Sequence, residues 1–421
     1  MRSGVGPLGR ARMLSFDDAR RRAASVDPLA AERVPLAHAV GHILAEPVHA
    51  AQEVPHVATS AMDGWALAIP VEAPDASSSW TLRAEAALSP VQQLAPLEPG
   101  EAAEVVTGSP VPQGTVSVLR SEHGILEGRQ LRAAIASPDT APRRNVRSAG
   151  TECPAGAEVL SGGTLLTPAR AAVAAVAGCD RLTVIPRPRV HLVLTGEEVI
   201  TCGIPSGGQV RDVFGLALPG MLTEIGAASV ASTRLGDDHE ALARELGRLL
   251  EAGATDLIIT SGGTSHSRAD SLRPALRSLG AELIADSVDM RPGHPSVLAR
   301  LQGSAGTVHL LGLPGNPLAG FAALAALGAP LVDALRGVPA AERTRTLSLT
   351  AGTRIHGAAH GVRLLPVWIG PEGALPLEHS SSHMMRGLAD AHALAIVGRA
   401  GADPGEPLQG LDVPGQRRGG H

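Results

Sequence analysis

The chain is nearly devoid of aromatic residues and contains no lysine. Aromatics make up 1% of its 421 residues, and tyrosine is absent. Because single-stranded nucleic acids are held largely by stacking on aromatic rings, the composition argues against nucleic-acid binding. All 36 basic residues of the Lys and Arg class are arginines. Their identity excludes Schiff-base catalysis by lysine and a phosphate loop of the G-x-x-x-x-G-K type.

Cysteines and long apolar runs are also scarce. Cys153, Cys179 and Cys202 show no C-x-x-C spacing, which predicts a reducing compartment without disulfides or structural zinc. We find no uninterrupted apolar run of the ~20 residues that cross a bilayer, and residues 1–13 lack the apolar core of a signal peptide. We therefore expect a cytoplasmic protein without membrane contact. A net charge of −5 means that any anion site must be local.

The length predicts several domains, since single cores stop growing at ~250–300 residues. Short apolar runs near 190–194, 256–260 and 308–311 are typical of buried parallel strands. They alternate with helical stretches, which predicts a central three-layer α/β domain with a mostly parallel sheet. The expected helices cover 215–224, 239–251, 271–279 and 318–327.

Regions rich in Pro and Gly flank this α/β part and predict β-rich domains. The expected division is a split N-terminal domain (13–53 and 141–185), an inserted β-rich domain (54–140), the α/β domain (186–338) and a C-terminal β-rich domain (339–413). Ser15 followed by two acids predicts the start of an N-terminal helix.

Six short motifs stand out along the chain. They are Ser60-Ala-Met-Asp-Gly64, Thr107-Gly-Ser-Pro-Val-Pro112, Thr195-Gly-Glu-Glu198, Thr260-Ser-Gly-Gly-Thr-Ser265, Gly312-Leu-Pro-Gly-Asn-Pro317 and Ser380-Ser-Ser382. Each alone is compatible with an ordinary turn. Two of them follow expected strands, at the edge where ligands of parallel sheets bind.

The two motifs after strands have the composition of an anion or phosphate site. Ser261, Gly262, Gly263, Thr264 and Ser265 combine backbone N–H groups that a ligand can approach with hydroxyl groups. In the other, Pro314, Gly315 and Asn316 form a rigid loop, and Asn316 can cap the following helix. A purely structural turn is the alternative for both.

In their order and spacing, these motifs resemble the molybdopterin molybdenumtransferase family, over about residues 15–413. The resemblance implies molybdenum cofactor biosynthesis: a molybdopterin-binding α/β domain, insertion of molybdenum from molybdate into adenylated molybdopterin, and release of AMP. It also implies Mg²⁺ as cofactor, since cleavage of a pyrophosphate needs a cation held by hard carboxylates. A homodimer whose active site draws on both chains is implied as well.

The resemblance also implies roles for single residues. The catalytic candidates are Asp63, Asp238 and Asp270, of which Asp238 and Asp270 would hold the metal. The loop residues above, with Glu198, would bind the substrate, and Arg291, His294, Arg363 and Ser382 would bind molybdate. A turn for Asp63 and a helix cap for Asp238 are the structural alternatives.

Several residues depart from the family pattern. Arg291-Pro-Gly-His294-Pro stands where Lys-Pro-Gly-Lys-Pro is usual, and Asp212-Val-Phe214 where Asp-Ser/Thr-Asn is usual. The other departures are Trp65 for Tyr, His266-Ser-Arg268 for a Gly-containing stretch, and Ala319 for Ser. Two alternatives therefore stay open: a degenerate pterin-binding paralogue without transferase activity, or a hydrolase of another pyrophosphate.

Overall fold

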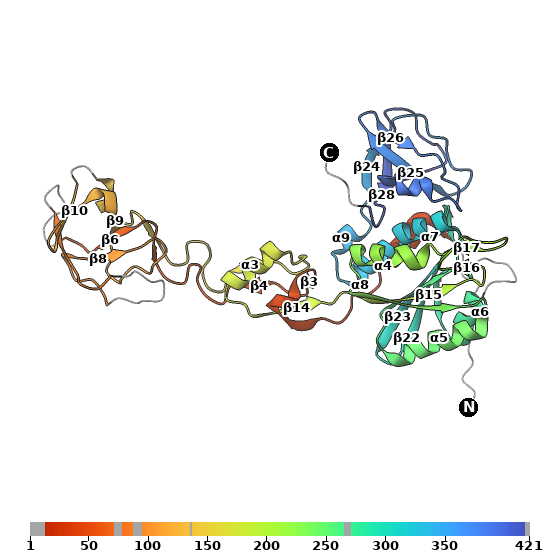
Figure 1. Ribbon diagram of the computed structural model, residues 1–421, viewed down its shortest axis with the longest axis horizontal. Helices are drawn as coiled ribbons and strands as arrows, with labels where there is room; N and C mark the ends of the chain where they lie inside the picture. Colours follow the sequence, from red (N-terminus) through yellow and green to blue (C-terminus); the bar gives the residue numbers. More distant parts are fainter. Residues whose placement is uncertain (1–12, 71–77, 87–94, 135–136, 265–270, 417–421) are drawn as a thin grey trace. The chain divides into compact units, whose positions relative to one another are not determined.

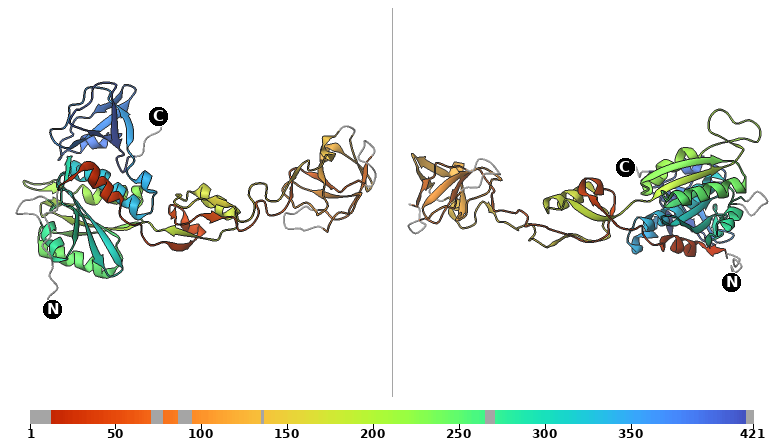
Figure 2. Two further views of the ribbon diagram at one scale, coloured as in Figure 1. Left: turned by 180° about the vertical axis from the view of Figure 1, so that it is seen from behind. Right: turned by 90° about the horizontal axis from the view of Figure 1, so that it is seen from below.

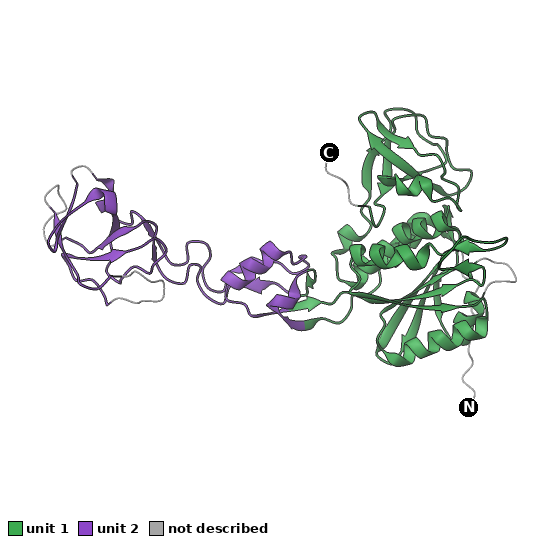
Figure 3. Cartoon of the chain, viewed as in Figure 1, with its two compact units in different colours: residues 1–32, 41–45, 183–421 green, residues 33–40, 46–182 purple. Residues whose placement is uncertain are grey.

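The computed structural model describes residues 13–416 except 71–77, 87–94, 135–136 and 265–270. The chain forms two compact units (Figure 3). The larger unit holds Met1–Glu32, Gly41–Ala45 and Thr183–His421, and the smaller unit holds Arg33–Val40 and Glu46–Leu182.

A six-stranded sheet forms the centre of the larger unit (Figure 1). The first four strands in its spatial order are parallel, and the last two run antiparallel to their neighbours. The order is β18 (Ser229–Leu235), β15 (Arg189–Thr195), β19 (Leu257–Ser261), β23 (Gly306–Leu313), β22 (Val297–Gly303) and β20 (Glu282–Ala285). The mostly parallel sheet predicted from the apolar runs is confirmed.

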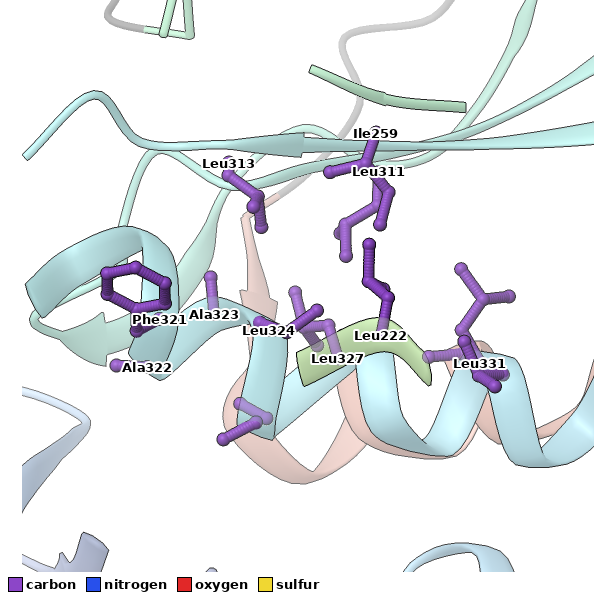
Figure 4. Close-up of a cluster of buried hydrophobic side chains, with 14 of the residues drawn as sticks. Leu222, Ile259, Leu311, Leu313, Phe321, Ala322, Ala323, Leu324, Leu327 and Leu331 are labelled. Carbon is purple, nitrogen blue, oxygen red and sulfur yellow. The ribbon is translucent and has the colours of Figure 1, made fainter. Parts of the chain in front are cut away.

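Helices cover both faces of this sheet, as Figures 1 and 2 show. One face packs against α1 (Phe16–Ala24), α4 (Phe214–Ile225), α7 (Pro317–Ala323) and α8 (Ala329–Leu335). The other packs against α5 (His239–Ala252) and α6 (Leu272–Ser278). Figure 4 shows the first core, where Ile259 and Leu311 of the sheet meet Leu222, Leu324 and Leu327 of the helices. The three-layer α/β prediction is therefore confirmed.

The helical run Pro317–Leu335 is long and apolar enough to cross a membrane by length and composition alone, although Asp333 interrupts its apolar residues. However, 89% of its apolar window is buried inside the protein. Its Ala and Leu side chains fill the core between the sheet, α1 and α4. Burial on all sides therefore explains its composition, as in the central helix of a large core.

The N-terminal helix packs in the larger unit. Ser15 caps α1 as expected, with its Oγ accepting from the Asp18 N–H at 3.1 Å. Phe16 is in the main core, and Arg20 donates from Nη1 to the Ala326 carbonyl at 3.3 Å. The structure thus groups residues 13–32 with the α/β sheet, because these contacts join α1 to the main core and to the π-helical segment Leu324–Gly328 between α7 and α8. The finer four-domain division stays a prediction.

A seven-stranded sheet occupies the C-terminal part of the larger unit and has its own core. Two of its strands, β1 and β21, come from outside the C-terminal segment. The strands are β1 (Leu14–Ser15), β21 (Val288–Arg291), β25 (Val362–Gly370), β26 (Gly373–Pro376), β27 (Ala393–Val397), β28 (Pro407–Leu411) and β24 (Leu347–Thr350). Because β21 pairs with β25, residues about 70 positions apart in sequence become neighbours.

The smaller unit is mostly β-structure, as predicted from its Pro and Gly content. Its six-stranded sheet has the order β10 (Gly124–Glu127), β11 (Gln130–Ala133), β7 (Ser79–Leu82), β8 (Glu101–Val105), β6 (Gly64–Leu67) and β9 (Ser117–Arg120). Its helix α3 (Pro168–Val176) begins after Thr167, whose side chain caps it. Shorter elements of the two units are β2 (Glu32–Pro35), α2 (Leu36–Ala39), β3 (Ile43–Leu44), β4 (Val48–His49), β5 (Thr59–Ser60), β12 (Val146–Arg147), β13 (Glu158–Leu160), β14 (Arg181–Ile185), β16 (Val199–Ile200), β17 (Val210–Arg211), α9 (Ala340–Arg343) and α10 (Arg386–Ala389).

One buried histidine predicts how the larger unit responds to acid. Burial first, and then the neighbouring positive charge of Arg300, lower the pKa of His309 to about 4. The unfolded chain therefore takes up this proton first, so stability present above pH 6.5 should fall by roughly 3 kcal/mol as the pH drops to about 4. Urea midpoints at pH 7 and 4.5 should differ less in His309→Gln than in the parent. The exposed His356→Gln is the control, and an unchanged pH dependence in His309→Gln would contradict the assignment.

Candidate functional site

Three loops at the carboxyl ends of parallel strands surround a cavity of 820 Å³, here called the loop cavity. The first follows β15, the second follows β19 and the third follows β23. The lining includes most of the predicted substrate residues, namely Glu198, Ser261, Gly262, Gly263, Thr264, Pro314, Gly315 and Asn316. Ser265, also predicted, lies outside the described residues. The cavity occupies the edge at which parallel sheets bind ligands.

Hydrogen bonds between the three loops fix their positions. Thr195 donates from Oγ1 to the Ser261 carbonyl at 2.6 Å, and the Gly262 N–H donates to the Leu313 carbonyl at 3.0 Å. Gly262 and Gly263 have φ angles of +82° and +64°, which side chains rarely adopt. A Cβ on Gly263 would lie 2.6 Å from the Ser271 Oγ. Glycine is therefore required here by both backbone and space, and the loop backbone is left open toward the cavity.

A second cavity of 460 Å³, here called the arginine cavity, adjoins the first. It contains all four residues predicted for molybdate: Arg291, His294, Arg363 and Ser382. The two cavities share Pro295, Pro314 and Asn316 in their walls. Asn316 is at the cap position of α7, but its side chain makes no capping bond and donates instead to the Ser382 Oγ at 3.4 Å. The Asn316 side chain, which was expected to cap α7, therefore connects the loop after β23 to Ser382 instead.

The sheet register places two guanidinium groups at the arginine cavity. Arg291 on β21 and Arg363 on β25 are direct partners in parallel strands. Among the residues that the structure describes, neither has an acidic partner within salt-bridge distance. Side chains at paired positions point to the same face of a sheet. The cavity is therefore locally positive although the chain carries a net charge of −5, which suits an oxyanion.

His294 is held in a defined orientation at the arginine cavity. Its Nδ1 lies 2.9 Å from the Val288 carbonyl oxygen, and the Val288 N–H donates to the His294 carbonyl at 3.0 Å. Because a carbonyl only accepts, Nδ1 carries the hydrogen. The second ring nitrogen, Nε2, is then the one that can contact a ligand in the cavity.

Two adjacent acids, Asp237 and Asp238, precede α5. Asp238 caps α5 by accepting from the N–H groups of Glu240 and Ala241, at 3.0 and 3.3 Å. The bond from Glu240 is the main reason why the pKa of Asp238 lies below its ordinary value. Asp237 accepts from the Glu197 N–H at 3.3 Å and lines the loop cavity, as Glu198 and Asp212 also do. The metal role predicted for Asp238 stays a prediction.

The sequence contained a signal for the difference between these two residues. In Gly236-Asp-Asp-His, the second Asp directly precedes the helix and is the natural cap, whereas the first lies one residue before the cap. Asp270, the other predicted metal ligand, lies outside the described residues. Within the part of the chain that the structure describes, no group of three His, Cys, Asp or Glu residues could hold a metal.

In the smaller unit, the first two motifs meet at Asp63. Thr107 donates to the Asp63 Oδ1 from its N–H at 2.6 Å and from its Oγ1 at 2.8 Å. These bonds, the N–H first, lower the pKa of this exposed carboxyl. Asp63 is therefore ionised and held in place rather than mobile.

The substitutions in the family pattern change the cavity walls without breaking the fold. Phe214 is buried and packs against Phe321, with ring centroids 5.2 Å apart. Asp212, the acid at the start of the same triplet, makes two polar contacts: it accepts from the Gly215 N–H at 2.9 Å and forms an ion pair with Arg234. Ala319 lines the arginine cavity through a methyl group, and its N–H donates to the Ser382 carbonyl at 3.3 Å. Arg234 and His383, which also line the loop cavity, carry no signal in the sequence alone.

Comparisons with known proteins agree with this arrangement. Residues 14–178 match the family described as MoeA N-terminal region (domain I and II), and residues 191–334 match the probable molybdopterin binding domain. The molybdopterin molybdenumtransferase of Nostoc sp. is 30% identical over 400 residues, which cover 91% of this chain and 89% of that protein. Molybdopterin molybdenumtransferase 2 of Mycobacterium tuberculosis is 30% identical over 383 residues, covering 86% and 90%.

A solved structure shares the fold. The molybdopterin biosynthesis MoeA protein of Pyrococcus horikoshii superposes with a TM-score of 0.76 at 21% identity, covering 96% of this chain and all of that one. At this identity the likeness concerns the fold alone. Identity and coverage against the curated relatives go further: the chain belongs to the molybdopterin molybdenumtransferase family, whose enzymes act in molybdenum cofactor biosynthesis.

Proposed function

We propose that the loop cavity binds the phosphates of adenylated molybdopterin and that the arginine cavity holds molybdate beside it. The observation that carries this proposal is the shared wall of Pro295, Pro314 and Asn316. Two ligands in cavities with a common wall are held close together, which replaces a bimolecular encounter by a positioned one. The open backbone of the glycine loop suits phosphate, and the arginine pair suits a dianion.

The same site offers ligands for Mg²⁺. Asp237 and Glu198 supply hard oxygen atoms at the loop cavity, and Mg²⁺ usually takes one or two carboxylates together with substrate phosphates and water. These residues therefore fit a cation that is completed by a pyrophosphate. The cation would neutralise charge on the phosphates during cleavage. Water adds to phosphorus as the P–O–P bond breaks, which yields AMP and the phosphate of molybdopterin.

The proposal is tested by one reconstitution. Purified protein is incubated with adenylated molybdopterin, Mg²⁺ and molybdate, and AMP and pterin-bound molybdenum are measured. We expect both products, with AMP release dependent on molybdate. No product would indicate a paralogue that only binds pterin, an outcome that the substitutions at Phe214 and Ala319 allow. AMP without molybdate dependence would indicate a pyrophosphate hydrolase.

We also propose a cytoplasmic homodimer in which Asp63 serves the site of the second subunit. Asp63 is ionised and fixed by Thr107, yet it belongs to the smaller unit. Asp63→Asn and Asp237→Asn should each be inactive alone. Refolded together, random pairing should restore roughly one quarter of the sites. Failure of the mixture to regain activity, with dimers confirmed by ultracentrifugation, would place both residues in one chain's site.

A further inference from the structure

Arg273 is a buried arginine that the proposed reaction does not use. It lies on α6, is 6% exposed, and lines neither cavity. A buried guanidinium is costly unless its N–H groups are paired. Its hydrogen-bond partners therefore indicate which segments of the fold it holds together.

The guanidinium of Arg273 joins two segments that lead to different cavities. Its Nη1 donates to the Thr264 carbonyl at 2.8 Å, at the end of the glycine loop. Its Nη2 donates to the Asp286 carbonyl at 2.6 Å, and its Nε donates to the Asp286 Oδ1. Only arginine offers this many donors in one rigid plane.

Asp286 is connected in turn to the arginine cavity. It lies in the turn between β20 and β21, two residues before Val288. Val288 exchanges two hydrogen bonds with His294, through its N–H and its carbonyl. The same strand ends at Arg291. Hydrogen bonds and a short stretch of backbone thus connect the glycine loop, through Arg273 and Asp286, to Arg291 on β21 and to His294 in the loop that follows it.

We infer that Arg273 is a positioning residue that couples the two cavities. It fixes the glycine loop relative to β21, so that a phosphate and an oxyanion are held at a set separation. The identity of these ligands rests on the proposed function, whereas the mechanical link does not. If the link transmits binding, molybdate changes the affinity for AMP, and AMP changes the affinity for molybdate by the same factor.

Arg273→Lys tests this inference without removing the positive charge that pairs with Asp286. The ammonium group keeps the charge opposite Asp286 but cannot reach three acceptors in one plane. We expect the factor by which molybdate changes the AMP dissociation constant to fall toward one. AMP release at saturating substrates should drop about tenfold or more, as expected for misplacement of reacting groups, while the KM values change little. Arg277→Lys, an exposed position on the same helix, is the matched control and should leave all three quantities unchanged.

Two outcomes would overturn the inference. One is an AMP affinity that responds to molybdate equally in the parent and Arg273→Lys, or that does not respond in the parent. The other comes from hydrogen exchange without ligands: Arg273→Lys should raise exchange both in Gly262–Thr264 and in Val288–His294. Faster exchange in only one segment, or in neither, removes the link. Because that measurement needs no substrate, it separates failure of the coupling from failure of the proposed function.

Discussion

Asp237→Asn should lower the rate of AMP release by about 10²–10³, the usual cost of removing one charge-stabilising group from a catalytic site. The side chain keeps its size but loses the carboxylate that faces the loop cavity. If Asp237 holds the cation, raising the Mg²⁺ concentration should recover part of the loss. AMP binding in the absence of Mg²⁺ should be retained. Single-turnover assays over a range of Mg²⁺ concentrations measure both effects.

Asp238→Asn is the matched control because it removes the same charge one residue away. Asparagine caps helices about as well as aspartate, so α5 should keep its N-terminus and the protein its stability. Its rate should stay near that of the parent. Loss of activity in Asp238→Asn but not in Asp237→Asn would show that the cation is held by Asp238, as predicted from the sequence, and not by Asp237. Asp270→Asn is expected to behave like Asp237→Asn.

The α/β domain could be predicted from sequence because its signals are local. Runs such as Leu257–Ser261 are short, apolar and followed at once by glycine, so strand and loop are both visible in the letters. The packing partner of a helix is not local information. The cap of α1 was predictable from Ser15, but its position against α8 depends on contacts with Ala326 and the core.

The candidate site shows the same division. Motif resemblance indicated Arg291 and Arg363, but only the pairing of β21 with β25 shows that they are neighbours. The choice between Asp237 and Asp238 depends on which of them the helix uses as its cap. The sequence alone did not single out Arg273. Because every residue of the Lys and Arg class in this chain is an arginine, residue type cannot separate the buried Arg273 from an exposed residue such as Arg277.

The arginine cavity should lose molybdate affinity when either guanidinium is removed. Arg291→Gln and Arg363→Gln each delete a charge-assisted hydrogen bond, which contributes about 1.5–3 kcal/mol and thus about 10–100-fold in the dissociation constant. The effects should not be additive, since the two residues are paired in neighbouring strands and would share one ligand in the proposed site. Arg354→Gln, which removes an exposed partner of Asp403 in the same C-terminal sheet domain, is the control. Calorimetric titration with molybdate, with sulfate as a second oxyanion, measures the change.

The charge of the side chain at position 294 should set how strongly the arginine cavity holds a dianion. The Nδ1 of His294 is committed to the Val288 carbonyl, which leaves Nε2 as the ring nitrogen that can contact a ligand. A permanent positive charge at this position should attract molybdate more strongly than a neutral polar group does.

His294→Lys should therefore tighten molybdate binding, because an ammonium group at this position is charged at neutral pH and lies beside Arg291 and Arg363 in the wall of the cavity. His294→Gln, which is polar and neutral, should bind molybdate more weakly than His294→Lys. The comparison separates charge from shape, since both variants lose the imidazole and only one carries a cation. Calorimetric titrations of the parent and the two variants with molybdate measure the difference. Equal affinities in His294→Lys and His294→Gln would mean that Arg291 and Arg363 alone hold the oxyanion. Barely detectable binding in all three proteins would instead mean that the methyl group of Ala319 in the cavity wall leaves the oxyanion with too few polar partners.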